Sequence, residues 1–136
     1  MAEVGFEDWV ETVHAWVKRE PLWQSLAYRK ALYLYECVWQ DCGVLRSDVR
    51  GKAIVEQLIR SSGSISANLE EGHGRGYGRQ RNWFWKVAIG SGRESKGWYW
   101  RAKSLLPPKT LDRRLDLLDE IIALLITELK RQERYT

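Results

Sequence analysis

Few residues of this chain have the types and spacing that catalysis or metal binding needs. Its histidines are His14 and His73, and its cysteines are Cys37 and Cys42. Neither pair has the spacing of a four-ligand zinc site, and the chain has no glycine loop of the kind that binds nucleoside triphosphates. No Arg precedes either His by the four to six residues typical of helical-bundle ribonucleases. The sequence therefore predicts no catalytic residue, no metal ligand and no cofactor.

Positive charge is concentrated in one part of the chain. Residues 73–105 carry eight Lys and Arg but a single acid, Glu94, for a net charge of +7, whereas the whole chain has a net charge of +4. A polyanion is the natural partner of such a segment, although a basic surface can also serve solubility alone. We predict that nucleic acid, either RNA or DNA, contacts Arg75, Arg79, Arg81, Lys86, Arg93, Lys96 and Lys103.

A helical wheel at about 100° per residue predicts how the side chains of residues 79–103 are arranged. The expected core face consists of Phe84, Val87, Ala88, Ser91, Trp98 and Ala102. The cations fall on another face, which also holds Trp85, Ile89 and Trp100. Large apolar groups among cations are unusual in solvent. Either they form a subunit interface with a basic rim, or the indoles stack on nucleic-acid bases. The two interpretations are compatible in a ring-shaped assembly.

A glycine-rich segment precedes this helix. Residues 72–79 read Gly-His-Gly-Arg-Gly-Tyr-Gly-Arg, a pattern that cannot continue a helix. Tyr77 lies between Arg75 and Arg79, as in the Gly-Arg-aromatic segments of nonspecific RNA-binding proteins. We expect this loop to contact phosphates without base specificity. The alternative is a flexible turn with no ligand.

Polar side chains recur along the edge of the preceding predicted helix. They are spaced 3, 4, 4 and 3 residues apart and are Gln57, Arg60, Ser64, Asn68 and Glu71. Such a row predicts a hydrogen-bonded ladder inside the protein. Glu94 lies near the expected core face of the next helix and needs a charged or multi-donor partner, which Arg60 or Asn68 could supply. We interpret this polar network as structural rather than catalytic.

The elements that position these residues are helices throughout. We expect helices over residues 6–19, 22–41, 47–71 and 80–106, followed by one that begins near Thr110. Pro21 can open a helix, and Gly43 is expected to end one. Trp9, Trp16 and Trp23, seven residues apart, share one stripe if the first two helices are nearly continuous. The fold class is all-α, an up-down-up-down four-helix bundle with a short extra N-terminal helical segment.

The last helix has more apolar surface than one bundle seam requires. Its seam consists of Leu111, Leu115, Leu118, Ile122, Leu125 and Leu129. A second stripe lies beside it and consists of Leu117, Ile121 and Leu124. An apolar arc this wide indicates a partner surface, unless the N-terminal helix covers it. We assign this stripe, together with Trp85, Ile89 and Trp100, to a homo-oligomer interface.

The length of 136 residues and the 44% hydrophobic content suit one domain over residues 1–136, with residues 1–20 as an N-terminal extension. No apolar run approaches the roughly 20 residues of a membrane span, and the acidic start is unlike a signal peptide. Two cysteines cannot form a disulfide framework. We therefore expect a reduced, soluble and cytoplasmic protein without membrane partners.

The segment from Gln57 to Arg75 resembles a family signature. The proteins encoded in intervening sequences of bacterial large-subunit ribosomal RNA genes read Gln-Leu-x-Arg-Ala-x-x-Ser-Ile-Pro-x-Asn-Ile-x-Glu-Gly-x-x-Arg. The matching residues are Gln57, Leu58, Arg60, Ser64, Ile65, Asn68, Glu71, Gly72 and Arg75. A second resemblance covers Trp83, Phe84, Ala88, Gly90, Ser91 and Glu94. Ser66 replaces the usual Pro, and Gly92 replaces a usual apolar residue.

This resemblance implies a left-handed up-down bundle that assembles as a homopentamer. It also implies kinship with the accessory protein of diversity-generating retroelements, a basic bundle that binds a reverse transcriptase and nucleic acid. No catalytic residue comes with the family. The leading hypothesis is a non-enzymatic oligomeric bundle that binds nucleic acid largely without sequence specificity. The alternative is an interaction scaffold or accessory subunit of a reverse transcriptase.

Overall fold

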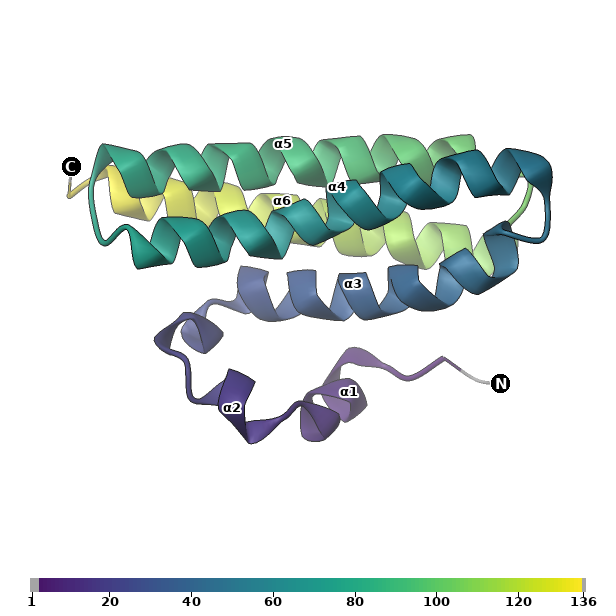
Figure 1. Cartoon of the computed structure of the whole chain (residues 1–136). Helices are drawn as coiled ribbons and strands as arrows, with labels where there is room; N and C mark the ends of the chain where they lie inside the picture. The colour runs from purple at the N-terminus through teal and green to yellow at the C-terminus, as the bar shows by residue number, and fades with distance from the viewer. Residues whose placement is uncertain (1–2, 136) are drawn as a thin grey trace.

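The computed structural model describes residues 3–135, and every regular element in that range is helical. Three short elements come first: α1 (Phe6–Thr12), α2 (Ala15–Lys18) and a 3-10 turn, η1 (Pro21–Gln24). Four long helices follow: α3 (Leu26–Leu45), α4 (Val49–Gly74), α5 (Arg79–Arg101) and α6 (Pro108–Glu133). Figure 1 shows each long helix running antiparallel to the one before it, which is the up-down-up-down arrangement and confirms the predicted fold class.

Local side-chain chemistry fixes where the long helices begin. The Ser25 hydroxyl accepts a hydrogen bond of 3.1 Å from the Tyr28 amide and caps α3. The Asp48 carboxylate accepts one of 2.8 Å from the Arg50 amide and caps α4. Side-chain oxygens at this position satisfy backbone donors that the first helical turn leaves free. Pro108 occupies the first turn of α6, so that helix begins before the predicted start at Thr110.

The helix ends differ from the expected ones at two glycines. Gly43 does not end α3, because the helix continues through it to Leu45. A Cβ built on Gly43 would have nothing within 4 Å. Gly72 also remains helical, because the left-handed positions come later, at Gly76 and Gly78 with φ of 86° and 88°. The predicted eight-residue loop is therefore a short turn between Gly74 and Arg79.

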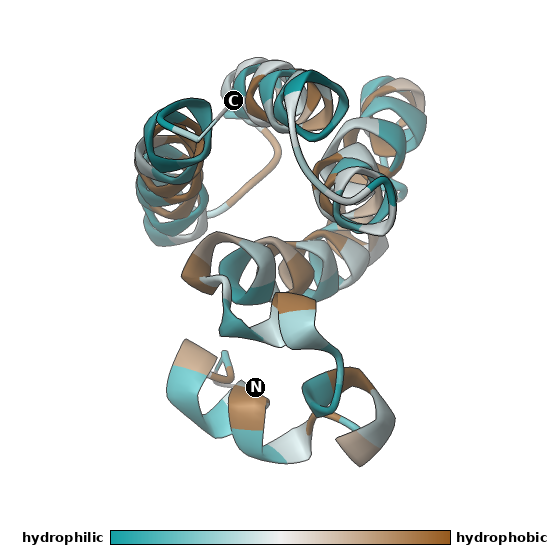
Figure 2. Ribbon diagram, turned by 90° about the vertical axis from the view of Figure 1, so that its left-hand side faces the viewer, coloured by the Kyte–Doolittle hydropathy of each residue, from teal (hydrophilic) through white to brown (hydrophobic). Residues whose placement is uncertain are grey.

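Each long helix packs on two others, α3 and α5 on both α4 and α6, around one apolar core. The predicted α6 seam supplies Leu118, Ile122, Leu125 and Leu129 to buried positions. The α4 contribution is Leu58, Ile65 and Leu69, as its spacing predicts. In Figure 2 the brown apolar parts of the long helices turn toward the common axis.

The N-terminal segment lies along the outer side of α3, the helix diagonally opposite α5 (Figures 1 and 2). The ring of Trp9 contacts the rings of Tyr33 and Trp23, at centroid distances of 5.5 and 6.4 Å. The Tyr33 hydroxyl donates a 2.7 Å hydrogen bond to the Val4 carbonyl. Trp16 is exposed, so the three evenly spaced tryptophans do not form one stripe. The reason is that the segment is broken into short helices rather than continuous.

Candidate functional site

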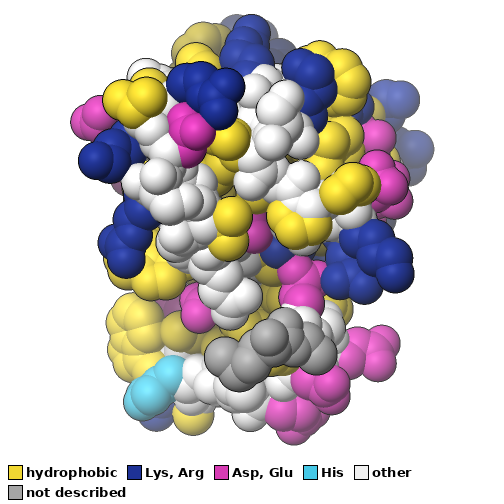
Figure 3. All heavy atoms as spheres, turned by 90° about the vertical axis from the view of Figure 1, so that its right-hand side faces the viewer, with side chains coloured by type: hydrophobic (Ala, Val, Ile, Leu, Met, Phe, Trp, Pro, Cys, Tyr) yellow, Lys and Arg dark blue, Asp and Glu magenta, His cyan; other side chains and the backbone are white. Residues whose placement is uncertain are grey.

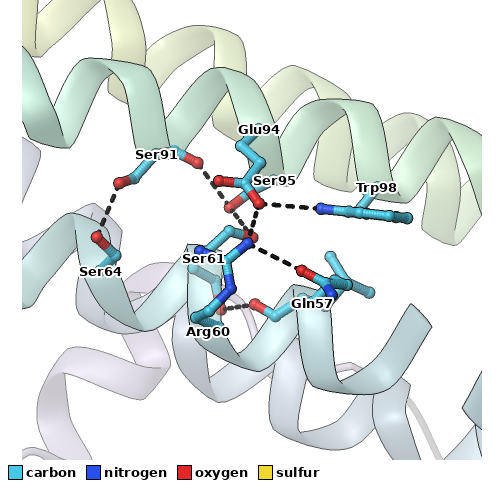
Figure 4. A network of polar contacts seen from close by, with 10 residues as sticks. Gln57, Arg60, Ser61, Ser64, Ser91, Glu94, Ser95 and Trp98 are labelled. Atoms are coloured by element: carbon cyan, nitrogen blue, oxygen red, sulfur yellow. Dashed lines mark hydrogen bonds and ion pairs between the residues drawn. The ribbon is translucent and has the colours of Figure 1, made fainter. Parts of the chain in front are cut away.

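The polar network predicted from α4 joins α4 to α5 (Figure 4). The Arg60 guanidinium donates to Gln57 Oε1 at 2.9 Å and forms a close ion pair with Glu94. Trp98 Nε1 donates to the same Glu94 carboxylate at 3.2 Å. Of the two predicted partners of Glu94, Arg60 and Asn68, Arg60 forms the contact. Because both side chains are partly exposed, this contact positions the helices more than it stabilises them.

A second group of hydrogen bonds lies one turn further along the same two helices. The hydroxyls of Ser64 and Ser91 are 2.8 Å apart, and Asn68 Nδ2 donates to Ser64 Oγ at 2.8 Å. Closer to the core, Ser95 Oγ donates to Ser61 Oγ at 2.9 Å (Figure 4). Small hydroxyl side chains allow α4 and α5 to approach closely while each buried polar group finds a partner.

Glu71 does not belong to this network. Its carboxylate accepts a 2.7 Å hydrogen bond from Arg75 Nη2 on the solvent side of α4. The predicted ladder of five residues is therefore two separate groups plus one exposed pair. The wheel placed all five residues along one edge, but the last turn of α4 extends past the serine-rich contact with α5.

The core face of α5 is rotated from the predicted one. Its buried residues include Trp85, Ala88, Gly92, Ser95 and Tyr99, which centre about 70° from the expected face at 100° per residue. Trp85 is 1% exposed, and its Nε1 donates to Glu128 Oε1 at 3.1 Å. The placement of Trp85 on the basic face is therefore wrong. Gly92 leaves the space that Ile122 fills, with a built Cβ 3.1 Å from Ile122 Cγ1.

The predicted oligomer interface is mostly taken up by the bundle itself. Ile121 is fully buried, and like Trp85 it cannot face a second copy, which corrects the prediction for both residues. Ile89, Leu117 and Leu124 are half-buried against the core. Trp100 alone among the predicted interface residues is exposed, at 56%. The wide apolar arc of α6 is needed because α6 packs on both α3 and α5.

The predicted cations differ in what already neutralises them. Lys96 Nζ lies 2.6 Å from Asp119, Lys86 Nζ lies 3.9 Å from Glu133, and Arg75 pairs with Glu71. Among the described residues, Arg79, Arg81 and Arg93 have no ion-pair partner. Lys103 Nζ lies 4.7 Å from the centroid of the Trp100 ring.

Two exposed indoles lie among these cations. A hollow of about 470 Å³ is lined by Arg79, Trp83 and Lys86, with Asn82 and the carboxylate of Glu133 completing it. Another of about 390 Å³ is lined by Arg93, Lys96 and Trp100, with Gly97 and Leu115. Trp83, which is 61% exposed, was not predicted for this face, although it lies within about 60° of Arg79 and Lys86 on the wheel. The outward side of α5 and of the turn that follows it is called the basic surface below, and it is formed by Arg79, Trp83, Lys86, Arg93, Lys96, Trp100 and Lys103.

A buried charged cluster that was not predicted from the sequence lies between α3, α5 and α6. Arg114 donates to both Asp41 oxygens, Nε at 2.7 Å and Nη2 at 3.0 Å, and the Tyr99 hydroxyl donates to Asp41 at 2.6 Å. Glu3 of the N-terminal segment lies 2.5 Å from Arg114 Nη2. A signal was available: Asp41 and Arg114 have opposite charges and stand at core spacing, three residues after Val38 and four before Leu118.

This environment changes the titration of three groups. Burial raises the pKa of the Tyr99 phenol well above its usual range, and the Asp41 carboxylate raises it further. Burial also raises the pKa of the nearby Cys37 thiol to about 11. For Arg114 burial acts in the lowering direction, but the hydrogen bonds with Asp41 and Glu3 outweigh it, so its pKa lies above the ordinary value. The buried, mutually hydrogen-bonded side chains of this cluster hold the helices together and do not form an accessible reactive site.

Within residues 3–135 no group of three or more His, Cys, Asp or Glu is arranged to hold a metal ion. Over the same residues, no helix combines the length and apolarity needed to span a bilayer. Both cysteines are free and buried.

The class of protein that this geometry defines is a four-helix bundle whose central helices meet through Arg60, Glu94 and paired serines. A family model described as 23S rRNA-intervening sequence protein matches residues 24–127, and the chain belongs to this family. The N-terminal segment lies outside the match. The comparison with curated proteins gives no match.

A solved structure from Bacteroides thetaiotaomicron has the same fold. It is described as a protein with unknown function from the S23 ribosomal protein family. The TM-score is 0.72 at 19% sequence identity, over 77% of this chain and 99% of that chain. Similarity at this identity establishes the four-helix architecture alone.

Proposed function

We propose that this protein is a non-enzymatic, oligomeric bundle that binds RNA or DNA in the cytoplasm, largely without sequence specificity. The observation that carries the proposal is the basic surface, where each of two exposed indoles lines a hollow with two cations. Lys and Arg neutralise phosphates, and an indole offers a stacking face to any base. The segment of net charge +7 supplies all of these residues.

The distribution of charge supports the same proposal. Residues 3–20 carry five acids and two bases, and they lie against α3, away from the basic surface on α5. In Figure 3 most acidic side chains of the lower part belong to this N-terminal segment, while Lys and Arg surround the upper, four-helix part. Such a polarity orients a polyanion toward α5 before contact.

The absence of sequence specificity follows from the kind of contact. Exposed Lys and Arg side chains on one helix reach phosphates, which are the same at every position of a strand. We infer no catalysis, because the polar network and the buried cluster are held in mutual hydrogen bonds rather than presented to a substrate.

Assembly into a homo-oligomer, a pentamer by resemblance to the family, remains part of the proposal. Trp100 is the exposed apolar residue of α5 best placed for it, and the other predicted interface residues that are not fully buried are the half-buried Ile89 of α5 and Leu117 and Leu124 of α6. Light scattering at two protein concentrations tests the assembly state. A monomer at both concentrations would contradict this part of the proposal.

The nucleic-acid part is tested by fluorescence anisotropy with labelled oligonucleotides at increasing salt. We expect affinity to fall steeply with salt, and to fall further in the double variant Arg79→Glu/Arg93→Glu. The matched control is Lys18→Glu/Arg19→Glu, which makes the same charge change on the N-terminal segment. No binding at low salt, or equal losses in both variants, would overturn the proposal.

A second candidate is a protein-interaction scaffold, such as an accessory subunit of a reverse transcriptase. The observation that favours it is Trp39, an exposed indole of α3 whose ring lies 6.4 Å from that of Tyr35, outside the basic surface. Pull-down of a polymerase that persists after charge reversal of Lys86 and Arg93 would support this candidate. Loss of the polymerase in that variant would instead support a contact through the basic surface.

A further inference from the structure

Two adjoining hollows lie at the end of the bundle where the α4–α5 turn meets the last turns of α6. Figures 1 and 2 show this turn and the C-terminal end of α6 at the same end of the molecule. The outer hollow, of about 230 Å³, is lined by Tyr77, Arg81, Arg131, Gln132 and Tyr135. The inner hollow, of about 410 Å³, is lined by Ser25, Arg81, Trp85, Glu128, Arg131 and Gln132. Arg81, Arg131 and Gln132 therefore form the boundary between them.

The outer hollow presents aromatic rings to solvent. Tyr77 is 90% exposed and Tyr135 is 85% exposed, although both line the same hollow. The lining is largely apolar, and the Arg81 guanidinium lies 5.9 Å from the Tyr77 ring centroid. Its volume is below the roughly 300 Å³ at which pockets for drug-sized ligands begin. A single planar ring fits these properties, because aromatic faces stack on any base.

The boundary between the hollows has unused hydrogen-bonding capacity. Arg81 Nε and Gln132 Oε1 are buried and have no hydrogen-bond partner among the described residues. Arg81 and Arg131 also have no carboxylate partner there. Buried polar atoms normally have partners, so unsatisfied ones require an explanation. Two guanidinium groups at one boundary are suited to a phosphate.

The inner hollow adds an acceptor. Glu128 is held in place by the Ser25 hydroxyl, at 2.9 and 2.8 Å from its two oxygens, and by Trp85 Nε1 at 3.1 Å. A carboxylate has about four acceptor positions, and these two donors do not fill them. A carboxylate repels phosphate but accepts a hydrogen bond from a hydroxyl. The 2′-hydroxyl is the group that distinguishes RNA from DNA at such a position.

We propose that this end of the bundle binds an unpaired ribonucleotide of an RNA strand. Its base stacks on Tyr77 and Tyr135, its phosphate lies between Arg81 and Arg131, and its ribose hydroxyl donates to Glu128. The inference rests on the proposed nucleic-acid binding and specifies it as single-stranded RNA. A base-paired strand is excluded because its bases are already stacked and cannot enter the outer hollow.

The test compares single-stranded RNA, single-stranded DNA of the same sequence and double-stranded RNA by anisotropy at one salt concentration. We expect the single-stranded RNA to bind best. The double variant Tyr77→Ala/Tyr135→Ala should weaken its binding about tenfold and leave the duplex unchanged. Tyr77→Phe/Tyr135→Phe keeps the rings and should restore the affinity. Trp39→Ala, which removes an exposed indole of α3, is the matched control and should have no effect.

The ribose contact is tested with Glu128→Gln. The amide oxygen of Gln can still accept from Ser25 and Trp85, and an unchanged circular dichroism melting curve verifies the fold. We expect the preference for RNA over DNA to fall in this variant. The inference would be overturned if single-stranded RNA bound no better than single-stranded DNA or double-stranded RNA, and if the tyrosine variants left binding unchanged. Salt-dependent binding with that outcome would leave the proposed nucleic-acid binding intact. No binding of any oligonucleotide at low salt would overturn both.

Discussion

Arg114 of α6 and Asp41 of α3 form a bidentate ion pair inside the protein, with nitrogen-to-oxygen distances of 2.7 and 3.0 Å. Both residues are buried, and the pair is completed by Tyr99 from α5. One hydrogen-bonded group therefore connects three of the four long helices. Because each charge is withdrawn from water, the pair makes removal of either partner costly, whatever its net contribution to stability.

The first prediction concerns that pair. Asp41→Ala leaves the Arg114 guanidinium buried with Glu3 as its remaining acid, and we expect a loss of about 3 to 5 kcal/mol in the free energy of unfolding. Urea denaturation measures it. Asp119→Ala is the control, since it breaks the exposed ion pair with Lys96 and should change stability by about 1 kcal/mol or less. Similar losses in the two variants would contradict the assigned burial.

The second prediction concerns alkaline pH. Burial raises the pKa of the Cys37 thiol from 9.0 to about 11, so the folded state retains this proton at a pH where the unfolded state loses it. Stability contributed by the neutral thiol is complete below pH 9 and is lost as pH rises toward 11. We expect a decrease of roughly 2 kcal/mol from this group over that interval. The pKa of Tyr99 is also raised, so its contribution to stability is complete below about pH 10 and is lost from there upward, which overlaps the upper half of the Cys37 interval.

The measurement is the urea midpoint at pH 8 and pH 11 for the wild type and for Cys37→Ala. The substitution lowers stability at both values by removing a buried side chain. What distinguishes the titration is the difference between the two pH values, which should be smaller in the variant. An equal difference in both proteins would assign the alkaline loss to other groups.

The sequence predicts a helix face correctly where the hydropathy of each residue indicates whether that residue is buried. The apolar spacing of α6 predicts its seam, and Arg60 is correctly offered as a partner of Glu94, because both patterns follow the helical period. The face of α5 is not predictable in the same way. Indoles occur around much of this helix, and the buried positions Gly92 and Ser95 carry no hydropathy signal. A face chosen by hydropathy is therefore centred too close to Trp98 and too far from Trp85.

The third prediction uses glycines that are alike in sequence but differ in surroundings. A Cβ on Gly72 would lie 2.7 Å from the Phe84 Cβ and 3.0 Å from the Trp85 ring. Gly72→Ala should therefore destabilise the protein by about 1 to 3 kcal/mol through overpacking. Gly90 lies in α5 with nothing within 4 Å, so Gly90→Ala should stabilise it by up to about 1 kcal/mol. Thermal melts of the two variants should shift in opposite directions, and shifts of the same sign would contradict the α4–α5 contact.

The fourth prediction separates cations that are free to bind phosphate from those already neutralised. Arg93 has no ion-pair partner among the described residues, whereas Lys96 Nζ lies 2.6 Å from Asp119. Loss of one phosphate contact reduces the slope of log affinity against log salt by about 1, so Arg93→Ala should show this reduction and Lys96→Ala a smaller one. Conversely, Asp119→Ala frees Lys96 and should raise affinity. If Asp119→Ala instead weakens binding, the carboxylate orients Lys96 toward the nucleic acid rather than competing with it.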